Sequence, residues 1–119
     1  MFMPKLNIDG NAFEGPNKLG KDKLPAEPAV AVIAVEAGEG IIILSVLESD
    51  NIARAVTESK WIDCWKKNAG EGKEGWKRDI DVYIQLNSNK LDREMIRERI
   101  RNKRRETIRC EDFKLPDFE

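Results

Sequence analysis

The amino-acid sequence predicts an α+β fold, in which helices pack on a small mixed or antiparallel sheet. Two short apolar runs rich in β-branched residues, joined by a turn that contains glycine, predict a hairpin over residues 29–47. Alternating polar and apolar residues predict one more strand over residues 79–86. Apolar residues at helical spacing, each series preceded by Ser, Asp or Asn, predict helices over about 50–66 and 89–106.

The hairpin is predicted to lie at the centre of the sheet. Its apolar residues continue without alternation, which indicates that both faces of its strands are covered. The strand over residues 79–86 instead alternates, so its face with Asp79, Asp81 and Tyr83 is expected to be solvated. In the last helix an apolar stripe is expected to face the sheet, and its members are Leu91, Met95, Ile96 and Ile100.

The remaining segments set the predicted domain organisation. Residues 1–28 are rich in Gly, Pro, Asn and Lys, and they predict an extended N-terminal arm with at most one short edge strand around residues 6–8. Residues 29–109 form the single α+β domain. A glycine-rich stretch over residues 68–75 predicts a mobile loop, and residues 110–119 read as an acidic C-terminal tail.

Composition removes several classes of activity. The 119 residues include no histidine, so neither a Ser-His nor a Cys-His nucleophile pair exists, and no imidazole can bind zinc. Cys64 and Cys110 are far apart and lack metal-site spacing, which predicts two buried free thiols in a reducing compartment. The paired Asp79 and Asp81 lack a third ligand and are read as solubilising. No cofactor and no metal site are therefore predicted.

Neither a membrane span nor a secretory signal is predicted. The longest apolar run is far shorter than the roughly 20 residues that a membrane-spanning helix needs. The N-terminus lacks the charged, apolar and small-residue order of a signal peptide, so the cytoplasm is the predicted location. The formal net charge of −1 favours no polyanionic partner for the chain as a whole.

The order hairpin, helix, strand, helix resembles the GIY-YIG endonuclease domain over residues 24–108. Residues 29–33, preceded by Leu24-Pro25, are similar to the family's first strand. Residues 43–52 are similar to its second strand and the start of its helix, and residues 91–100 to the segment that carries its metal ligand. The resemblance implies cleavage of phosphodiesters with one metal ion, a glutamate ligand, two tyrosines and an arginine.

The residues at the corresponding positions imply loss of this activity. In the family's order of two tyrosines, glycine, arginine and glutamate, this chain has Ala31, Ser45, Leu47, Ala55 and Arg97. A cation at Arg97 repels a metal ion, and Ala31 offers no hydrogen bond to water. The resemblance therefore implies a catalytically inactive domain. A divergent metal-dependent nuclease with displaced ligands is the least favoured alternative.

An arginine-rich segment suggests what an inactive domain could bind. Between Arg93 and Arg109 there are eight basic residues and three glutamates. This excess predicts weak binding of nucleic acid, and the candidate residues are Arg97, Arg101, Arg104, Arg105, Trp76 and Lys77.

Three further interpretations bear on this hypothesis. The alternative interpretation is a protein-interaction module, in which the basic helix contacts an acidic protein partner or a second copy of the chain. A solvated face, in which each glutamate pairs with an arginine three residues on, needs no ligand at all. Trp61 and Trp65 are one helical turn apart and are read as core residues.

Overall fold

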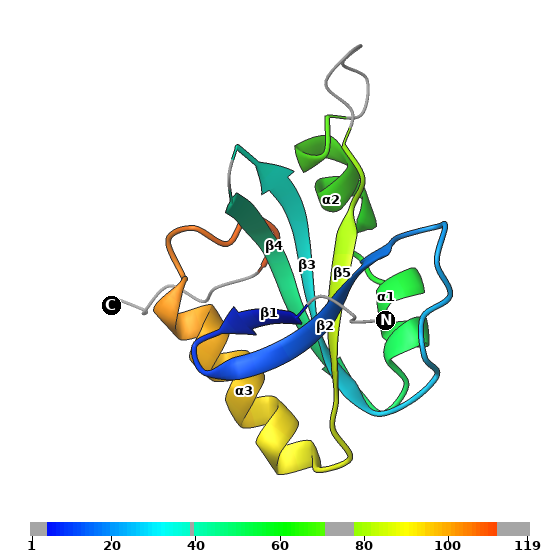
Figure 1. Cartoon of the computed structure of the whole chain (residues 1–119), viewed down its shortest axis with the longest axis vertical. Helices are drawn as coiled ribbons and strands as arrows, with labels where there is room; N and C mark the ends of the chain where they lie inside the picture. The colour runs from blue at the N-terminus through cyan, green and yellow to red at the C-terminus, as the bar shows by residue number, and fades with distance from the viewer. Residues whose placement is uncertain (1–4, 39, 71–77, 112–119) are drawn as a thin grey trace, which may run out of the picture.

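A computed structural model of the chain describes residues 5–38, 40–70 and 78–111, and it confirms the predicted α+β class (Figure 1). The strands within these ranges are β1 (Lys5–Ile8), β2 (Asn11–Lys18), β3 (Ala29–Ala37), β4 (Gly40–Ser49) and β5 (Asp81–Leu86). The helices are α1 (Ile52–Thr57), α2 (Ile62–Asn68) and α3 (Lys90–Lys103). The helix predicted over residues 50–66 is thus two short helices with a break between them.

The five strands form one antiparallel sheet in the order β1-β2-β5-β3-β4. The predicted hairpin is β3 and β4, and β3 lies next to the predicted strand β5. In this register Ala31 lies opposite Leu47 of β4 and Ile84 of β5. Strand β3 is therefore interior, while β1 and β4 are the two edge strands.

The edge strand expected around residues 6–8 is β1, but the chain after it is also part of the sheet, so the predicted extended arm is wrong for residues 11–18. Strand β2 pairs with β5, and Phe13 is fully buried. The Gly, Pro and Asn residues that suggested an arm serve the turns and irregularities of these strands. Asp9 and Gly10 have positive φ in the β1–β2 turn, as their sequence indicates.

Gly15 allows β2 to cross close to β5. A Cβ atom at this position would lie 2.9 Å from the Val82 carbonyl oxygen and 3.1 Å from Tyr83 Cδ1. The pairing register of β2 shifts between Glu14 and Asn17, around this glycine. A side chain here would push the two strands apart, so the close crossing requires glycine.

Both faces of β3 are covered, as its unbroken apolar sequence predicts. On one face Ala31 and Ile33 pack in a cluster with Trp65 and with the buried residues of α1. On the other face Val30 and Val32 pack with Phe13 of β2 and with buried isoleucines of α3. Figure 1 shows α3 lying across the sheet, away from α1 and α2. Helices on opposite faces thus enclose the central strand.

Helix α3 faces the sheet with a different set of side chains from the predicted apolar stripe. Ile96 and Ile100 are buried, but Leu91 and Met95 are 72% and 59% exposed. Arg93 is buried in their place, at 1% exposure. Helical periodicity alone gave no sign that an arginine would be turned inward.

Partners in β4 and in the turn before α3 explain the burial of Arg93. Its Nε lies 3.1 Å from a Glu48 oxygen and its Nη2 lies 2.6 Å from an Asp50 oxygen. Its Nη1 donates to the Asn87 carbonyl at 2.9 Å. Burial alone would lower the pKa of this guanidinium, but the hydrogen bonds to Glu48 and Asp50 outweigh it and raise the pKa above its usual value. This arginine therefore stays charged while it fixes α3 to the end of β4.

Cys64 and Cys110 form a disulfide, which corrects the prediction of two free thiols. The bond joins α2 to the segment that follows α3, across 46 residues of sequence. The Cys110 N–H also donates to the Leu44 carbonyl at 2.7 Å. Neither cysteine spacing nor composition reveals this pairing, because it depends on where the chain returns to the edge of β4.

The hydroxyl of Ser45 completes this attachment from inside the core. It accepts a hydrogen bond from Trp65 Nε1 at 2.8 Å and donates to the Cys110 carbonyl. All three residues are fully buried. The predicted core position of Trp65 is confirmed, and its indole nitrogen has a partner there.

We expect Ser45→Ala to lower the free energy of unfolding by about 2 kcal/mol, because it leaves the Trp65 N–H and the Cys110 carbonyl buried without this partner. Urea denaturation measures the change. Ser88→Ala is the matched control at an exposed serine, and it should change stability by less than about 0.5 kcal/mol. Equal effects of the two substitutions would contradict this role for Ser45.

Reduction of the disulfide should lower the free energy of unfolding by about 2–4 kcal/mol, because the reduced unfolded chain is less constrained. Denaturation with and without a dithiol reductant measures this difference. The Cys64→Ser variant should match the reduced parent and should not respond to reductant. A parent protein that is insensitive to reductant would show that the bond contributes nothing.

Candidate functional site

The positions that correspond to the nuclease residues do not gather in one hollow among the described residues. Ala31 lies in β3 and Ala55 in α1, and both pack in the core beneath α1 and α2. Ser45 is bonded to Trp65 of the same core. Arg97 is in α3, which covers the opposite face of the sheet. Leu47 packs against the same core as Ala31. Four of the five positions are therefore on one side of β3, and Arg97 is on the other.

Arg97 and Arg101 are engaged in contacts within the protein. Arg97 Nε donates to the Val46 carbonyl at 2.8 Å, and its Nη1 lies 3.0 Å from a Glu98 oxygen. Arg101 Nη1 lies 2.7 Å from the same Glu98 oxygen, three residues away in sequence. The side chains of Arg97 and Arg101 are 28% and 13% exposed. The predicted local pairing of charges is thus present for Glu98 and Arg101.

Arg97 and Arg101 share a further partner, Glu111, which the sequence did not reveal. One of its oxygens lies 3.6 Å from Arg97 Nη2 and 3.3 Å from Arg101 Nε. Its other oxygen accepts the Val46 N–H at 3.0 Å. The Glu111 side chain is 3% exposed, so this is a largely desolvated ionic contact. These two arginines hold the segment after α3 against β4.

The other predicted residues have different surroundings. Arg104 is 38% exposed, and its Nη2 lies 3.4 Å from an Asp9 oxygen. Arg105 is exposed at the end of α3. Trp76 and Lys77 lie outside the described residues. Of the described candidates, Arg104 and Arg105 are thus the two with the greater access to a ligand.

The exposed positive charge at the C-terminal end of α3 includes residues that the sequence analysis did not select. The exposed basic residues of this region, which we call the α3 basic end, are Arg99, Lys103 and Arg105. Lys103 Nζ lies 3.3 Å from the Asp9 carboxylate. Leu91 and Met95 precede Arg99 and Lys103 at four-residue intervals, so one exposed stripe of α3 contains all four. This stripe faces solvent because Arg93, Ile96 and Ile100 are buried on the other side of the helix.

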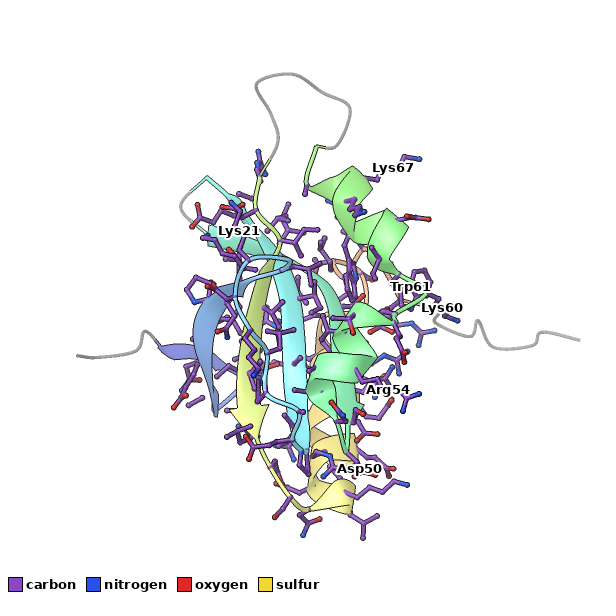
Figure 2. The ribbon with its side chains drawn as sticks, turned by 90° about the vertical axis from the view of Figure 1, so that its right-hand side faces the viewer. Lys21, Asp50, Arg54, Lys60, Trp61 and Lys67 are labelled. Carbon is purple, nitrogen blue, oxygen red and sulfur yellow. A yellow bond between two sulfur atoms is a disulfide. The ribbon has the colours of Figure 1, made fainter. Side chains whose placement is uncertain are left out.

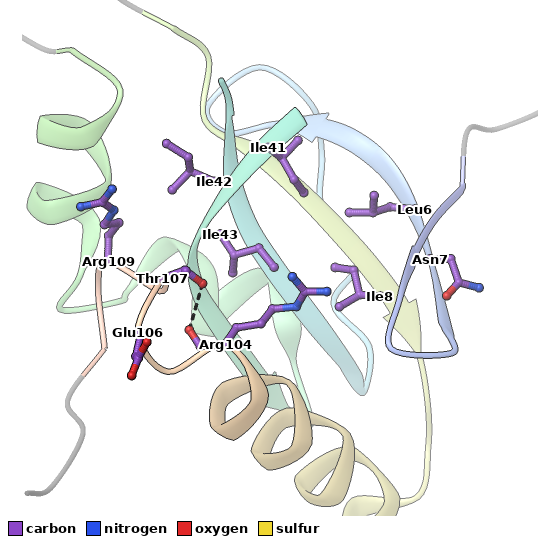
Figure 3. A pocket seen from close by; sticks show the side chains of 10 residues that line it. All are labelled: Leu6, Asn7, Ile8, Ile41, Ile42, Ile43, Arg104, Glu106, Thr107 and Arg109. Atoms are coloured by element: carbon purple, nitrogen blue, oxygen red, sulfur yellow. Dashed lines mark hydrogen bonds between the residues drawn. The ribbon is translucent and has the colours of Figure 1, made fainter. Parts of the chain in front are cut away.

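A groove of about 430 Å³ lies beside this basic end (Figure 3). Leu6 and Ile8 of β1 line one wall, and Ile41 and Ile43 of β4 line the other. The side chain of Arg104 extends across the groove between them. Its remaining lining residues are Asn7, Ile42, Glu106, Thr107 and Arg109. The groove therefore combines aliphatic walls with two arginines and one glutamate.

A second hollow, of about 370 Å³, is strongly polar and lies near the β3–β4 turn. Lys18 Nζ lies 3.3 Å from an Asp79 oxygen and 3.4 Å from an Asp81 oxygen. Asp81 is 2% exposed, which corrects the prediction of a solvated face for β5. Burial raises its pKa, although Lys18 opposes this effect. Strand β2, which the sequence did not predict, is what supplies Lys18 to this hollow.

The carboxylates of Asp79 and Asp81 in this hollow are paired with lysines. In residues 5–38, 40–70 and 78–111, no group of three or more Cys, Asp or Glu side chains is arranged to hold a metal ion. Asp79 is instead paired with Lys21 at 3.1 Å as well as with Lys18. The ionic partners of these acids are lysines of the same chain.

The opposite side of the molecule presents α1 and α2 to solvent (Figure 2). Trp61 is partly buried there, and the Lys60 ammonium lies 5.2 Å from the centre of its ring. Lys66 and Lys67 are exposed near the end of α2. The labelled Lys67, Lys60 and Arg54 follow one another along this side. It offers exposed positive charge that lies away from the groove.

Comparison with protein-family models, with curated proteins and with solved structures finds no match to this chain. No helix in the described part of the chain has the length and apolar character needed to cross a membrane.

We expect Asp81→Asn to change the pH dependence of stability. Because burial raises the pKa of Asp81, its stabilising contribution is complete below the ordinary carboxyl value of 3.8 and is lost as pH rises through the raised pKa. Asparagine stays neutral, so the stability of the variant minus that of the parent should increase with pH. Urea denaturation at several pH values measures this difference.

Asp79→Asn is a control with the opposite sign. Hydrogen bonds from Lys21 and Lys18 lower the pKa of Asp79, so its contribution is present above the ordinary value and is lost as pH falls. The stability of this variant minus that of the parent should therefore decrease as pH rises. The same trend for both variants would contradict these assignments.

Proposed function

We propose that this chain is a non-catalytic domain that binds nucleic acid weakly through the α3 basic end. The observation that carries the proposal is the set of exposed cations on the last turns of α3 and just after it, namely Arg99, Lys103 and Arg105. Exposed cations close together attract a phosphate backbone and release its counterions. Arg104 lies next to this surface, in the groove.

The proposed surface differs from the one selected from the sequence. Arg97 and Arg101 contact Glu98 and Glu111, so a phosphate would have to compete with internal carboxylates for them. We assign these two arginines to holding the segment after α3. Sequence-independent contact through the exposed cations fits the weak affinity that the sequence predicts.

The resemblance to GIY-YIG domains remains part of the proposal. The element order that suggests it, a hairpin followed by helix, strand and helix, corresponds to β3, β4, the helix pair α1 and α2, β5 and α3. Support for the absence of cleavage comes from the corresponding positions. Ala31 and Ala55 offer no polar side chain, and the Ser45 hydroxyl is already bonded to Trp65 and Cys110.

A cytoplasmic location also remains a proposal. The disulfide between Cys64 and Cys110 counts against it, because cytosolic thiols are usually kept reduced.

A protein-interaction module is the second candidate, and a specific observation favours it. Strands β1 and β4 are the two edge strands of the sheet, and a groove with aliphatic walls lies between them. Edge strands bind other chains through backbone hydrogen bonds.

Fluorescence anisotropy with labelled single- and double-stranded oligonucleotides at low salt tests nucleic-acid binding. We expect Arg99→Glu with Arg105→Glu to weaken binding about tenfold, because two phosphate contacts become repulsive. Lys66→Glu with Lys67→Glu makes the same change in net charge at α2 and should have a much smaller effect.

Binding should also weaken steeply as the salt concentration increases, with a smaller slope for the Arg99 and Arg105 variant. Two results would overturn the proposal. One is the absence of binding of either oligonucleotide up to roughly 100 µM protein, since the dissociation constants of non-specific binding are usually at or below that value. The other is equal weakening by the α3 and α2 variants.

A further inference from the structure

The groove lies between two backbone edges of one curled sheet. Its walls are formed by β1 and β4, which are the first and last strands in the sheet order. Leu6 and Ile8 face Ile41 and Ile43 across it (Figure 3). The four side chains are aliphatic, and none of the described residues that line the groove is aromatic. This surface suits an apolar side chain better than a stacked base, which is usually held by aromatic rings.

Part of the outer edge of β4 is already hydrogen-bonded to the segment that follows α3. The Ile43 carbonyl accepts the Arg109 N–H at 3.4 Å, and the Leu44 carbonyl accepts the Cys110 N–H at 2.7 Å. Two consecutive carbonyls can point outward here because the β3–β4 register shifts at Leu44. The pairing of residues 41–43 is regular, and backbone groups of alternate residues point the same way, so Ile41, like Ile43, directs its N–H and carbonyl away from β3. The edge at residues 40–42 therefore lies next to the part of β4 that the segment after α3 already pairs with.

Arg104 supplies a charge in this aliphatic groove. Its guanidinium reaches Asp9 at 3.4 Å through Nη2, and Asp9 is shared with Lys103. Its Nε is buried and has no hydrogen-bond partner among the described residues. A guanidinium presents several donors in a plane, and a carboxylate matches two of them at once. The groove is therefore complementary to an anionic group carried on an apolar or extended ligand.

We propose that this groove binds an extended peptide segment of a partner protein as an added strand along β4. The backbone of the peptide pairs with Ile41, an apolar side chain lies among Leu6, Ile8 and Ile43, and an acidic side chain or C-terminal carboxylate contacts Arg104. The proposal rests on the protein-interaction candidate and not on nucleic-acid binding. It names the chemistry of the partner as alternating apolar and polar residues with a carboxylate.

Selection from a displayed library of short random peptides, followed by fluorescence anisotropy with the enriched peptides, tests the proposal. The enriched sequences should contain aliphatic or aromatic residues near an Asp, a Glu or a free C-terminus. Leu6→Ser and Arg104→Gln should each weaken binding about tenfold, because one removes apolar contact and the other the charged hydrogen bond. Leu91→Ser, which removes an exposed leucine outside the groove, should leave the affinity unchanged.

Changes to the peptide keep the test independent of protein folding. Methylation of the backbone nitrogen that pairs with β4 should abolish binding, because it removes a donor and adds bulk at the edge. Amidation of the peptide's carboxylate should weaken binding to the parent protein and have little further effect on Arg104→Gln.

Several outcomes would overturn the proposal. They are failure to enrich any peptide, binding that tolerates every backbone methylation, and binding unaffected by both Leu6→Ser and Arg104→Gln. A concentration-dependent dimer in sedimentation that is abolished by Leu6→Ser would assign the groove to a second copy of this chain. Oligonucleotide binding that requires Leu6 would assign it to nucleic acid. Loss of oligonucleotide binding in the Arg99 and Arg105 variant, with peptide affinity retained, would separate the two proposed functions.

Discussion

The burial of β3 on both faces is the constraint from which the rest of the structure follows. Residues from Ala29 to Val35 have almost no exposed surface, so apolar layers must cover each side of the central strand. Helices α1 and α2 form one layer, while α3 and the curled β1–β2 hairpin form the other. This division also places Ala31 and Arg97 on opposite sides of the sheet. A single site built from both would have to pass through the packed core.

The arginines of α3 show how one charged segment can have two roles. Those that face β4 are paired with carboxylates and carbonyls and attach the chain to itself, as Arg93 does with Glu48 and Arg101 with Glu111. Those that face away remain at the surface. Breaking a buried pair leaves an uncompensated charge, whereas changing a surface charge costs little stability. Composition counts both kinds alike, but the second kind is the more exposed to a ligand.

Sequence reasoning succeeded where structure depends on neighbouring residues. The β3–β4 hairpin, strand β5 and the helical segments each have a local pattern of apolar residues. The Asn51 and Asn89 side chains also cap α1 and α3, whereas α2 has no side-chain cap. It failed for contacts between distant segments. Glu48 and Asp50, which bind Arg93, and Val46, which binds Glu111, lie more than 40 residues away from them in sequence, and the glycine and proline of β2 mask its strand. The surface that we propose is therefore on the same helix as the residues selected from the sequence, but on a partly different face.

Gly15 is a position at which the fold requires glycine, and composition does not reveal this requirement. The carbonyl of Val82 and the ring of Tyr83 occupy the space that any larger residue would need, and its φ of 154° adds a second reason for glycine. Apolar positions in the sheet can exchange one aliphatic residue for another at modest cost. Distant relatives with this architecture should thus keep a glycine one strand before the hairpin even after their cores have diverged, which offers an anchor for aligning sequences that otherwise share no recognisable identity.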